Sequence, residues 1–186
     1  MACEQAVTAV FGDGAVLARA GLIAGPGDGS DRFGYWVGRF ALAAEAGQQP
    51  VLVPDAADQG SQVIDVRDLA AWVLSAPDAG ASGPYNLVGD RYRLGDVLAA
   101  AREVAGHTGP VVAASQEWLE AHEVTGWSGP RSLTLWLPWA DHRGFERATT
   151  PARWPTGCGC VRSPRRSPTC WTTSGGSASA ATGRRA

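Results

Sequence analysis

The chain has 186 residues, about 1.2 times the roughly 150 residues expected for one domain, which predicts one domain plus an additional segment. Hydrophobic residues make up 45% and charged residues 18%, with 24 glycines and 12 prolines, which excludes an intrinsically disordered chain, a collagen and a coiled coil. The longest strongly apolar runs, such as 69–76, are less than half of the ~20 residues needed to cross a bilayer, and the first seven residues lack the basic residues of a secretory signal. We therefore expect no membrane association and no export.

Charge divides the chain into two parts. All 16 basic residues are arginine. Up to residue 146, nine arginines and all eighteen acidic residues give a net charge of −9, whereas the seven later arginines give +7. The sequence therefore predicts an acidic domain over 1–146 and a basic tail over 147–186.

The tail has almost no large aliphatic residues, so we expect it to be disordered. One interpretation is an arginine-rich arm that binds nucleic acid, and another is a solvated segment without a function. The interpretation we favour is that a GC-rich gene is read here in a shifted frame, which would produce a composition rich in Arg, Pro, Ser and Gly. Nucleic acid is therefore not the expected partner.

Cysteine spacing does not predict a metal site. Cys158, Cys160 and Cys170 lie in the tail without the paired arrangement of a zinc site. Cys3 shares a helical stripe with Ala6, Val7 and Val10, so we expect it to be a small buried hydrophobe. Without a disulfide framework, the cytoplasm is the expected compartment.

The acidic domain shows strands alternating with helices. In chain order, we predict a helix over 3–10, a strand over 15–20, a glycine-rich loop, a helix over 32–46 capped by Ser30 or Asp31, strands over 51–53 and 62–66, a helix from Asp65, a strand over 85–88, a helix over 94–104, a strand over 111–114 and a short helix over 116–122. Alternation of this kind implies parallel strands with crossover connections, hence the α/β class. Of these five candidates we expect only three or four to join one doubly wound sheet, which is few for such a sheet, so we interpret them as the end of a sheet whose beginning is missing.

Local motifs for catalysis are weak. The loop 25–30 follows a strand, but its spacing is not Gly-x-Gly-x-x-Gly, and Asp28 and Asp31 would repel a pyrophosphate, so we interpret it as a turn. Asp65 lies at a strand-to-helix junction, where ligands of open α/β sheets gather, although a helix N-cap is the interpretation that we favour. No Gly-x-Ser-x-Gly elbow occurs. The four tryptophans between positions 118 and 139 could line an apolar cleft or fill a small core, and the sequence leaves both open: Trp118, Trp127, Trp136 and Trp139.

Four blocks in this order resemble one family. They are 19–28 (RAGLIAGPGD), 31–33 (DRF), 63–70 (VIDVRDLA) and 85–89 (YNLVG), the last followed by the helix over 94–104. Together they resemble the extended short-chain dehydrogenases/reductases, also called NAD-dependent epimerases/dehydratases. The resemblance covers residues 2 to about 138 and departs mildly at Ala20, where the family often has proline. The segment 132–138 (SLTLWLP) is similar to the substrate side of actinobacterial-type reductases in that family.

The resemblance implies the C-terminal part of a Rossmann-like parallel sheet with a small substrate lobe. It implies NAD or NADP as the cofactor of the parent family, a strand end at Ala20, Gly21, Leu22 and Ile23 on the cofactor side, and Arg32, Tyr35 and Trp36 as substrate-pocket residues. In the family, a Tyr-x-x-x-Lys pair moves the proton, and a glycine-rich turn holds the dinucleotide. Because this chain has no lysine and no such turn, we assign no catalytic residue and no metal ligand.

The resemblance therefore predicts a truncated reductase or epimerase that is inactive alone and does not retain the dinucleotide. Its parent would act on a sugar nucleotide or a small carbonyl compound. The alternative is a non-catalytic binding or regulatory module of the same fold.

Overall fold

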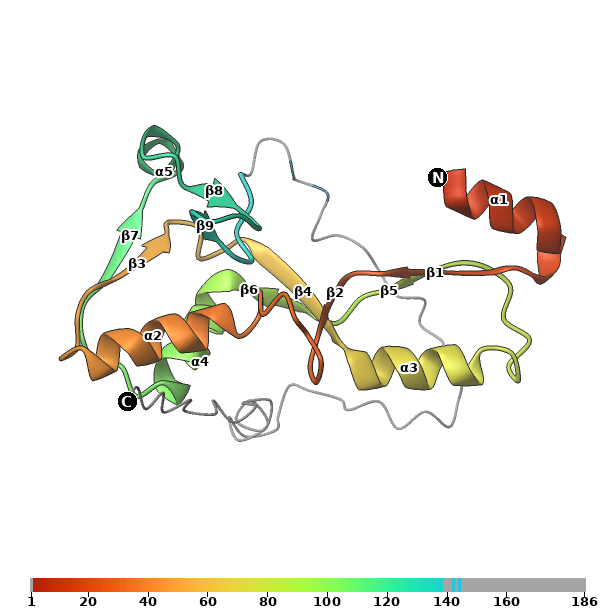
Figure 1. Cartoon of the computed structure of the whole chain (residues 1–186), viewed down its shortest axis with the longest axis horizontal. Helices are drawn as coiled ribbons and strands as arrows, with labels where there is room; N and C mark the ends of the chain where they lie inside the picture. Colours follow the sequence, from red (N-terminus) through yellow and green to blue (C-terminus); the bar gives the residue numbers. More distant parts are fainter. Residues whose placement is uncertain (1, 139–141, 143, 145–186) are drawn as a thin grey trace, which may run out of the picture.

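A computed structural model of the chain describes residues 2–138 together with residues 142 and 144. This part is elongated, with a larger group of elements at one end and a smaller group at the other (Figure 1). None of its helices is long and apolar enough to pass through a bilayer. The basic tail over 147–186, with its predicted disorder, lies outside the described residues.

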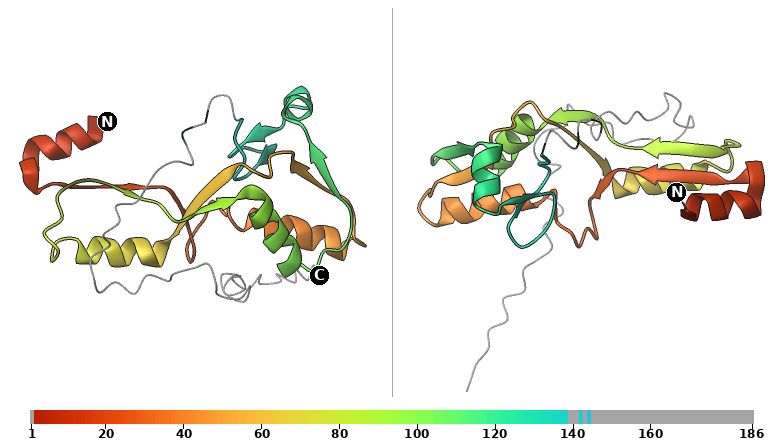
Figure 2. Two further views of the ribbon diagram at one scale, coloured as in Figure 1. Left: turned by 180° about the vertical axis from the view of Figure 1, so that it is seen from behind. Right: turned by 90° about the horizontal axis from the view of Figure 1, so that it is seen from above.

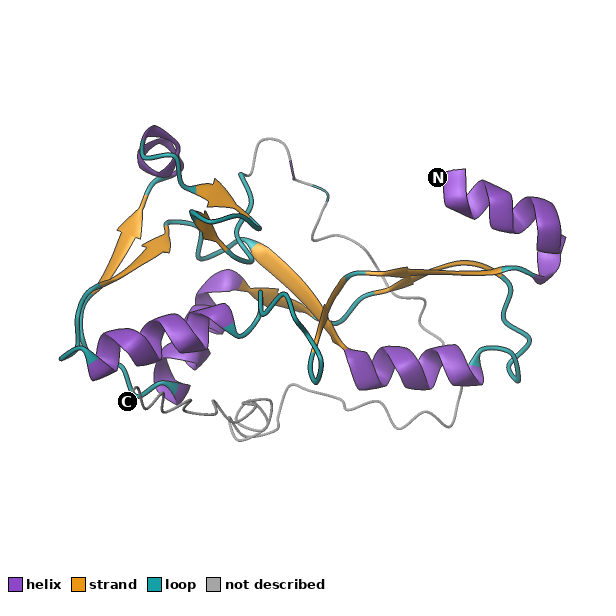
Figure 3. Cartoon of the chain, in the orientation of Figure 1, coloured by secondary structure: helices purple, strands orange, loops and turns teal. Residues whose placement is uncertain are grey.

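Helices and strands alternate along most of the described chain (Figure 3). In chain order they are α1 (Ala2–Phe11), the 3-10 helix η1 (Gly12–Gly14), β1 (Val16–Ala20), β2 (Leu22–Ala24), α2 (Tyr35–Glu45), β3 (Val51–Pro54), β4 (Gly60–Asp65), α3 (Val66–Ser75), β5 (Gly83–Leu87), β6 (Arg91–Arg93), α4 (Leu94–Val104), β7 (Val111–Ala114), α5 (Gln116–Ala121), β8 (Thr125–Gly126) and β9 (Ser132–Leu133). The five predicted strands are all present, with ends that differ by about two residues or fewer. The short strands β2, β6, β8 and β9 were not predicted.

Parallel pairing dominates the sheets, as predicted. β1 pairs with β5, β2 with β4, β3 with β7 and β8 with β9, all in parallel, whereas β6 joins β4 antiparallel. Parallel neighbours connected by helices identify an α/β fold and are consistent with the predicted Rossmann-like sheet. The α/β prediction is confirmed.

Gly21 is the point at which the chain changes sheet partners. Before it, β1 runs beside β5, with Ala20 opposite Leu87, and after it β2 runs beside β4. The Gly21 amide donates to the Leu87 carbonyl at 3.0 Å, and a Cβ at Gly21 would lie 2.8 Å from the Val88 Cγ1. A residue without a side chain therefore allows this close crossing.

Two separate hydrophobic clusters form the interior. The larger one packs α2 and α4 against β3, β7 and the β8–β9 region, and it contains the fully buried side chains of Trp36 and Phe40. The smaller one lies between α3 and the β1–β5 pair and has four buried residues, Ile64, Trp72, Ala76 and Leu87. Figure 2 shows from two further directions that α1 lies at the end opposite α2 and α4.

The observed N-caps agree with one prediction and correct another. Asp65 caps α3, since its side chain accepts the Arg67 amide, as predicted. The predicted cap of α2 at Ser30 or Asp31 is wrong: α2 begins after Gly34, which offers no side chain. Asp31 has φ +44°, so the chain turns there and the helix starts three residues later than the periodicity suggested.

The first helix also differs from expectation. α1 forms as predicted but buries none of its residues, and Cys3 is an exposed free thiol. The expected burial of Cys3 is therefore wrong. A helical stripe of small apolar residues predicts an amphipathic helix, but burial also needs a partner surface, and the other described residues cover only part of α1.

Candidate functional site

The carboxyl ends of two parallel strands define the edge where the candidate site begins. Ala24, the last residue of β2, pairs with Asp65, the last residue of β4. Because parallel strands end at the same edge, the loop after β2 and the start of α3 lie next to each other, and ligands of open α/β sheets bind at such edges. A Cβ at Gly25 would lie 3.2 Å from the Val66 Cγ1, which shows how close these segments are.

Asp65 is engaged by its own helix at this edge. Its carboxylate accepts the backbone amide of Arg67 at 2.8 Å and two guanidinium hydrogen bonds from the Arg67 side chain at 2.8 and 2.6 Å. These bonds lower the pKa of Asp65, mainly through the Arg67 side chain, against a smaller opposing effect of burial. Asp65 therefore remains ionised and serves as a helix cap, the interpretation favoured from the sequence.

The loop after β2 is a turn, as interpreted from the sequence. The Asp28 amide donates to the Gly25 carbonyl at 3.1 Å, and the Asp28 carboxylate accepts both the amide and the hydroxyl of Ser30. Positive φ values of +119° and +88° at Gly25 and Gly27 explain the two glycines. A phosphate-binding loop needs hydrogen-bond donors, whereas this loop presents the Asp28 carboxylate, which accepts hydrogen bonds.

The four residues on the predicted cofactor side lie on both sides of the sheet change. Ala20 and Ile23 are exposed, Gly21 is half-buried, and Leu22 is buried in the larger cluster. The exposed pair could lie against a flat ring, but the neighbouring loop supplies a carboxylate rather than phosphate-binding amides. The described residues therefore fit one end of a dinucleotide at most, and no reaction step can be derived through the cofactor.

The three predicted substrate residues follow the same loop but have different surroundings. Trp36 is 0% exposed, and its Nε1 donates to the Thr134 carbonyl at 3.0 Å. Tyr35 is half-buried, with its ring edge against Trp36 at a centroid distance of 5.1 Å. Arg32 is half-buried and places its guanidinium carbon 5.3 Å from the centroid of the Trp127 ring. Trp36 is thus a core residue, whereas Arg32 and Tyr35 remain partly exposed, and none of the three is among the residues that line the pocket described next.

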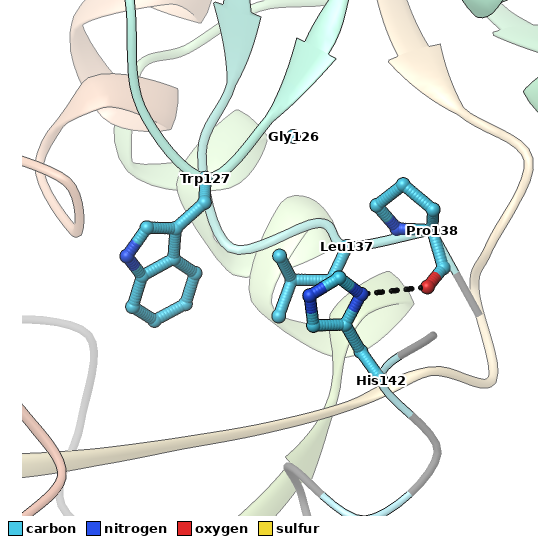
Figure 4. Close-up of a pocket in the computed structure, with 5 residues that line it drawn as sticks. All are labelled: Gly126, Trp127, Leu137, Pro138 and His142. Carbon is cyan, nitrogen blue, oxygen red and sulfur yellow. Dashed lines mark hydrogen bonds between the residues drawn. The ribbon is translucent and has the colours of Figure 1, made fainter. Parts of the chain in front are cut away.

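A pocket lies beside the Arg32–Trp127 pair. Its volume is about 480 Å³, and the residues that line it are Gly126, Trp127, Leu137, Pro138 and His142 (Figure 4). His142 Nδ1 lies 3.0 Å from the Pro138 carbonyl oxygen. Because a carbonyl oxygen only accepts, Nδ1 carries the proton, and in the neutral ring Nε2 is left as an acceptor.

The late tryptophans divide between the two interpretations left open by the sequence. Trp136 is buried in the larger cluster, whereas Trp127 lines the pocket and Trp118 is 44% exposed, stacked on His122. Trp139 lies outside the described residues. The sequence offered no local signal for the pairing of Trp127 with Arg32, because the two residues come from loops far apart in the chain.

The described residues contain no group of three His, Cys, Asp or Glu side chains that could hold a metal ion. His107 is buried after α4, where its Nε2 lies 2.9 Å from the Gln49 carbonyl oxygen. That contact joins the loop after α4 to the loop before β3. The described residues therefore form a pocket to which we assign neither a metal ligand nor a proton donor.

Comparisons with known proteins give structural matches only. No family model and no curated protein matches the sequence. Three similar solved structures are a dTDP-4-dehydrorhamnose reductase from Yersinia enterocolitica (16% identity, TM-score 0.45, 61% of this chain and 39% of that chain), a UDP-glucose 4-epimerase from Thermus thermophilus in complex with NAD (18%, 0.46, 77% and 45%) and RMD from Pseudomonas aeruginosa complexed with NADPH (20%, 0.49, 74% and 48%). The chain spans less than half the length of each of them. At these values the likeness carries no argument about this chain, whose family remains the expectation drawn from its sequence blocks.

Proposed function

We propose that this chain is the substrate-side part of an NAD(P)-dependent reductase or epimerase of the extended short-chain dehydrogenase type. The complete enzyme would transfer a hydride between nicotinamide and a sugar nucleotide or a small carbonyl compound, and the cytoplasm is the proposed compartment. The 186-residue chain itself would bind the small-molecule substrate without reducing it.

One observation carries this proposal. The loop that leaves the carboxyl end of β2 brings Arg32 onto Trp127, whose ring lines the pocket. A loop after a parallel strand is where α/β proteins hold their ligands, and a concave, mostly apolar site with few polar groups is typical of small-molecule binding. The predicted cofactor-side residues precede the same loop: Ala20 ends β1, and Ile23 lies in β2, from which the loop leaves.

The proposed inactivity follows from the residue types that are present. Proton transfer to a carbonyl oxygen needs a positioned acid, and the family pair requires a lysine four positions after a tyrosine. The whole chain has no lysine, and its tyrosines are Tyr35, Tyr85 and Tyr92. This chain would therefore contribute substrate binding and orientation, while the acid and the dinucleotide cradle belong to a part of the enzyme that its sequence does not contain.

The test uses the purified 186-residue chain. Titration with NADPH and with NADH, followed by tryptophan fluorescence, should show no saturable quenching, and no carbonyl compound should accelerate NADPH oxidation. Binding of either nucleotide at micromolar concentration would contradict the proposal. The coding DNA gives an independent readout: an in-frame Tyr-x-x-x-Lys upstream would support the proposal, and the longer product should then oxidise NADPH.

The second candidate is a non-catalytic binding or regulatory module. The contiguous cluster around Trp36 and Phe40 favours it, because a core of that kind could fold by itself. Such a module should unfold in one cooperative transition as a monomer or dimer, whereas a fragment that needs missing partners should aggregate before it unfolds. Calorimetry combined with sedimentation distinguishes the two.

A further inference from the structure

Arg32 differs from most of the other described arginines in its contacts. The side chains of Arg19, Arg67, Arg93 and Arg131 form ion pairs, and Arg102 donates to two backbone carbonyls. Among the described residues, the contact of the Arg32 guanidinium is with the face of Trp127. A guanidinium offers five N–H donors, so a half-buried one without an acceptor can receive an anion.

The pocket that is lined by Trp127, the residue contacted by Arg32, suits a flat apolar ring. Trp127, Leu137 and Pro138 supply most of its wall, and Figure 4 shows the Trp127 indole standing to one side of Leu137 and His142. Aromatic faces bind other rings by offset or edge contacts. The wall therefore favours a ring, and Arg32 favours a negative group attached to it.

The backbone of Trp127 has an energetically unfavourable conformation. Its φ is +70°, in the left-handed region that bulky residues avoid. Its amide lies 3.2 Å from the Leu133 carbonyl oxygen and 3.0 Å from the Trp136 carbonyl oxygen, and the adjacent Gly126 has no room for a Cβ, which would lie 2.7 Å from the Trp136 oxygen. Strain that the surrounding structure enforces in this way is characteristic of binding sites.

We propose that this pocket binds a small ring compound with a single negatively charged group, the ring lying against Trp127 and the charge at Arg32. The identification of this compound as the reacting substrate rests on the proposed function, whereas its binding does not. Within that function, the inference selects a small carbonyl compound over a sugar nucleotide.

Charge is the reason for a single negative group. Asp28 and Asp31 share the loop with Arg32, and residues 1–146 carry twice as many acids as arginines. One guanidinium can offset one negative charge, but a diphosphate would leave a second charge in an acidic surrounding. The surface therefore discriminates against nucleoside diphosphates.

The experiment measures binding of three probes to the full 186-residue chain without nicotinamide. The probes are benzoate, its neutral analogue benzamide, and UDP, each followed by ligand-observed NMR titration. Benzoate should bind more tightly than benzamide, on the order of 10-fold, because of the charged hydrogen bond to Arg32. UDP should bind more weakly than benzoate. Tighter binding of UDP, equal affinity for benzoate and benzamide, or no benzoate binding would overturn the inference.

Matched variants assign the site. Arg32→Gln should abolish the preference for benzoate over benzamide, whereas Arg39→Gln, an equal change of charge at an exposed arginine of α2, should leave it unchanged. Trp127→Phe should preserve binding of both probes better than Trp127→Leu, with circular dichroism checking that each variant folds. Equal benzoate affinity in the two arginine variants would refute the assignment to Arg32. A chain that bound NADPH would contradict the proposed function without affecting these probe results.

Discussion

Gly89 shows how a single residue limits the packing of this fold. It follows β5 so closely against β4 that a Cβ at this position would overlap the Val63 carbonyl oxygen. That neighbour is backbone and cannot rotate away, so the strand itself would have to move. The sequence motif around residues 85–89 therefore includes a steric requirement that no periodicity reveals.

Replacing Gly89 with alanine should lower the free energy of unfolding by roughly 3 kcal/mol, because the overlap with a backbone oxygen can be removed only by moving the strand. Urea denaturation followed by circular dichroism measures the change. Gly38→Ala is the control, since Gly38 lies in α2 with no atom within 4 Å of the position that a Cβ would take, and alanine there should stabilise the helix by about 0.5–1 kcal/mol. Equal stability of the two variants would contradict the close approach.

Asp65 is a partly buried carboxylate whose contribution to stability should depend on pH. The hydrogen bonds from Arg67 keep its folded pKa below the unfolded value, so its stabilising contribution is present above the unfolded pKa and is lost as the pH falls through the folded pKa. Asp65→Asn keeps a capping oxygen but removes the charge, which should cost less than about 1 kcal/mol at pH 7, because the Arg67 side chain is more than half exposed.

The difference between the parent chain and Asp65→Asn should shrink from about pH 4 downward, since the unfolded pKa of aspartate is about 3.9. Denaturation curves recorded between about pH 7 and strongly acidic solution measure this convergence. Asp58→Asn is the matched control, since the Asp58 side chain is 88% exposed in its ion pair with Arg93 and should contribute little. A difference that stayed constant with pH would contradict the lowered pKa of Asp65.

At the scale of elements, α1 is the helix with the least tertiary support. Val10 and Phe11 are 75% and 67% exposed, and the contact of α1 with the sheet includes the ion pair between Glu4 and Arg19. A second concave surface, lined by Glu4, Gln5, Thr8, Ala9 and Leu17, lies between α1 and β1. Exposed apolar side chains on a helix favour association with another surface.

The double substitution Val10→Ser and Phe11→Ser should reduce self-association and leave the free energy of unfolding within about 0.5 kcal/mol of the parent value, because exposed side chains contribute little to folding. Sedimentation velocity reports the association, and urea denaturation reports the stability. Phe40→Ser, at a buried position of α2, is the contrasting variant and should be strongly destabilised. A large loss of stability in the α1 variant would show that these side chains are buried in solution.

At the scale of the whole molecule, two hydrophobic clusters of unequal size meet at β4, where Val63 packs against the larger and Ile64 belongs to the smaller. The larger surrounds α2 and α4, and the smaller, with four buried residues, supports α3 and the β1–β5 pair. Since stabilisation grows with the apolar area buried, the two ends of the molecule should differ in local stability.

We therefore expect amide hydrogens to exchange faster at the end of the molecule that contains α1 than at the end that contains α2 and α4. Amides of β1 and β5 should exchange faster than those of α2 and α4, as measured by mass spectrometry of peptides from the intact chain. The β1–β5 pair has its own parallel hydrogen bonds, so slow exchange confined to that pair would contradict the order. Uniform exchange would instead indicate a single cooperative unit.

Much of the fold could be predicted because it is encoded locally. Helical spacing at Leu94, Val97, Leu98 and Ala101 predicted α4, whose apolar side is buried as expected. The Asp65 cap and the turn at Gly25 were predicted from residue chemistry that acts over two or three positions. The site was only partly predictable. Arg32 and Tyr35 were expected to line the substrate pocket, but neither is among its lining residues, and Arg32 instead contacts Trp127, which lines it.

The amino-acid sequence by itself determined the α/β class, most element positions and the charge division, because apolar period, capping chemistry and composition are properties of neighbouring residues. Only the tertiary structure decided that Trp36 is buried against the Thr134 carbonyl, 98 positions away, that Cys3 is exposed, and that Arg32 contacts Trp127, which lines a pocket. These outcomes depend on which distant surfaces come together. A contact between segments that are far apart in the chain produces no periodic pattern of residues in either segment, so the sequence of each segment does not predict it.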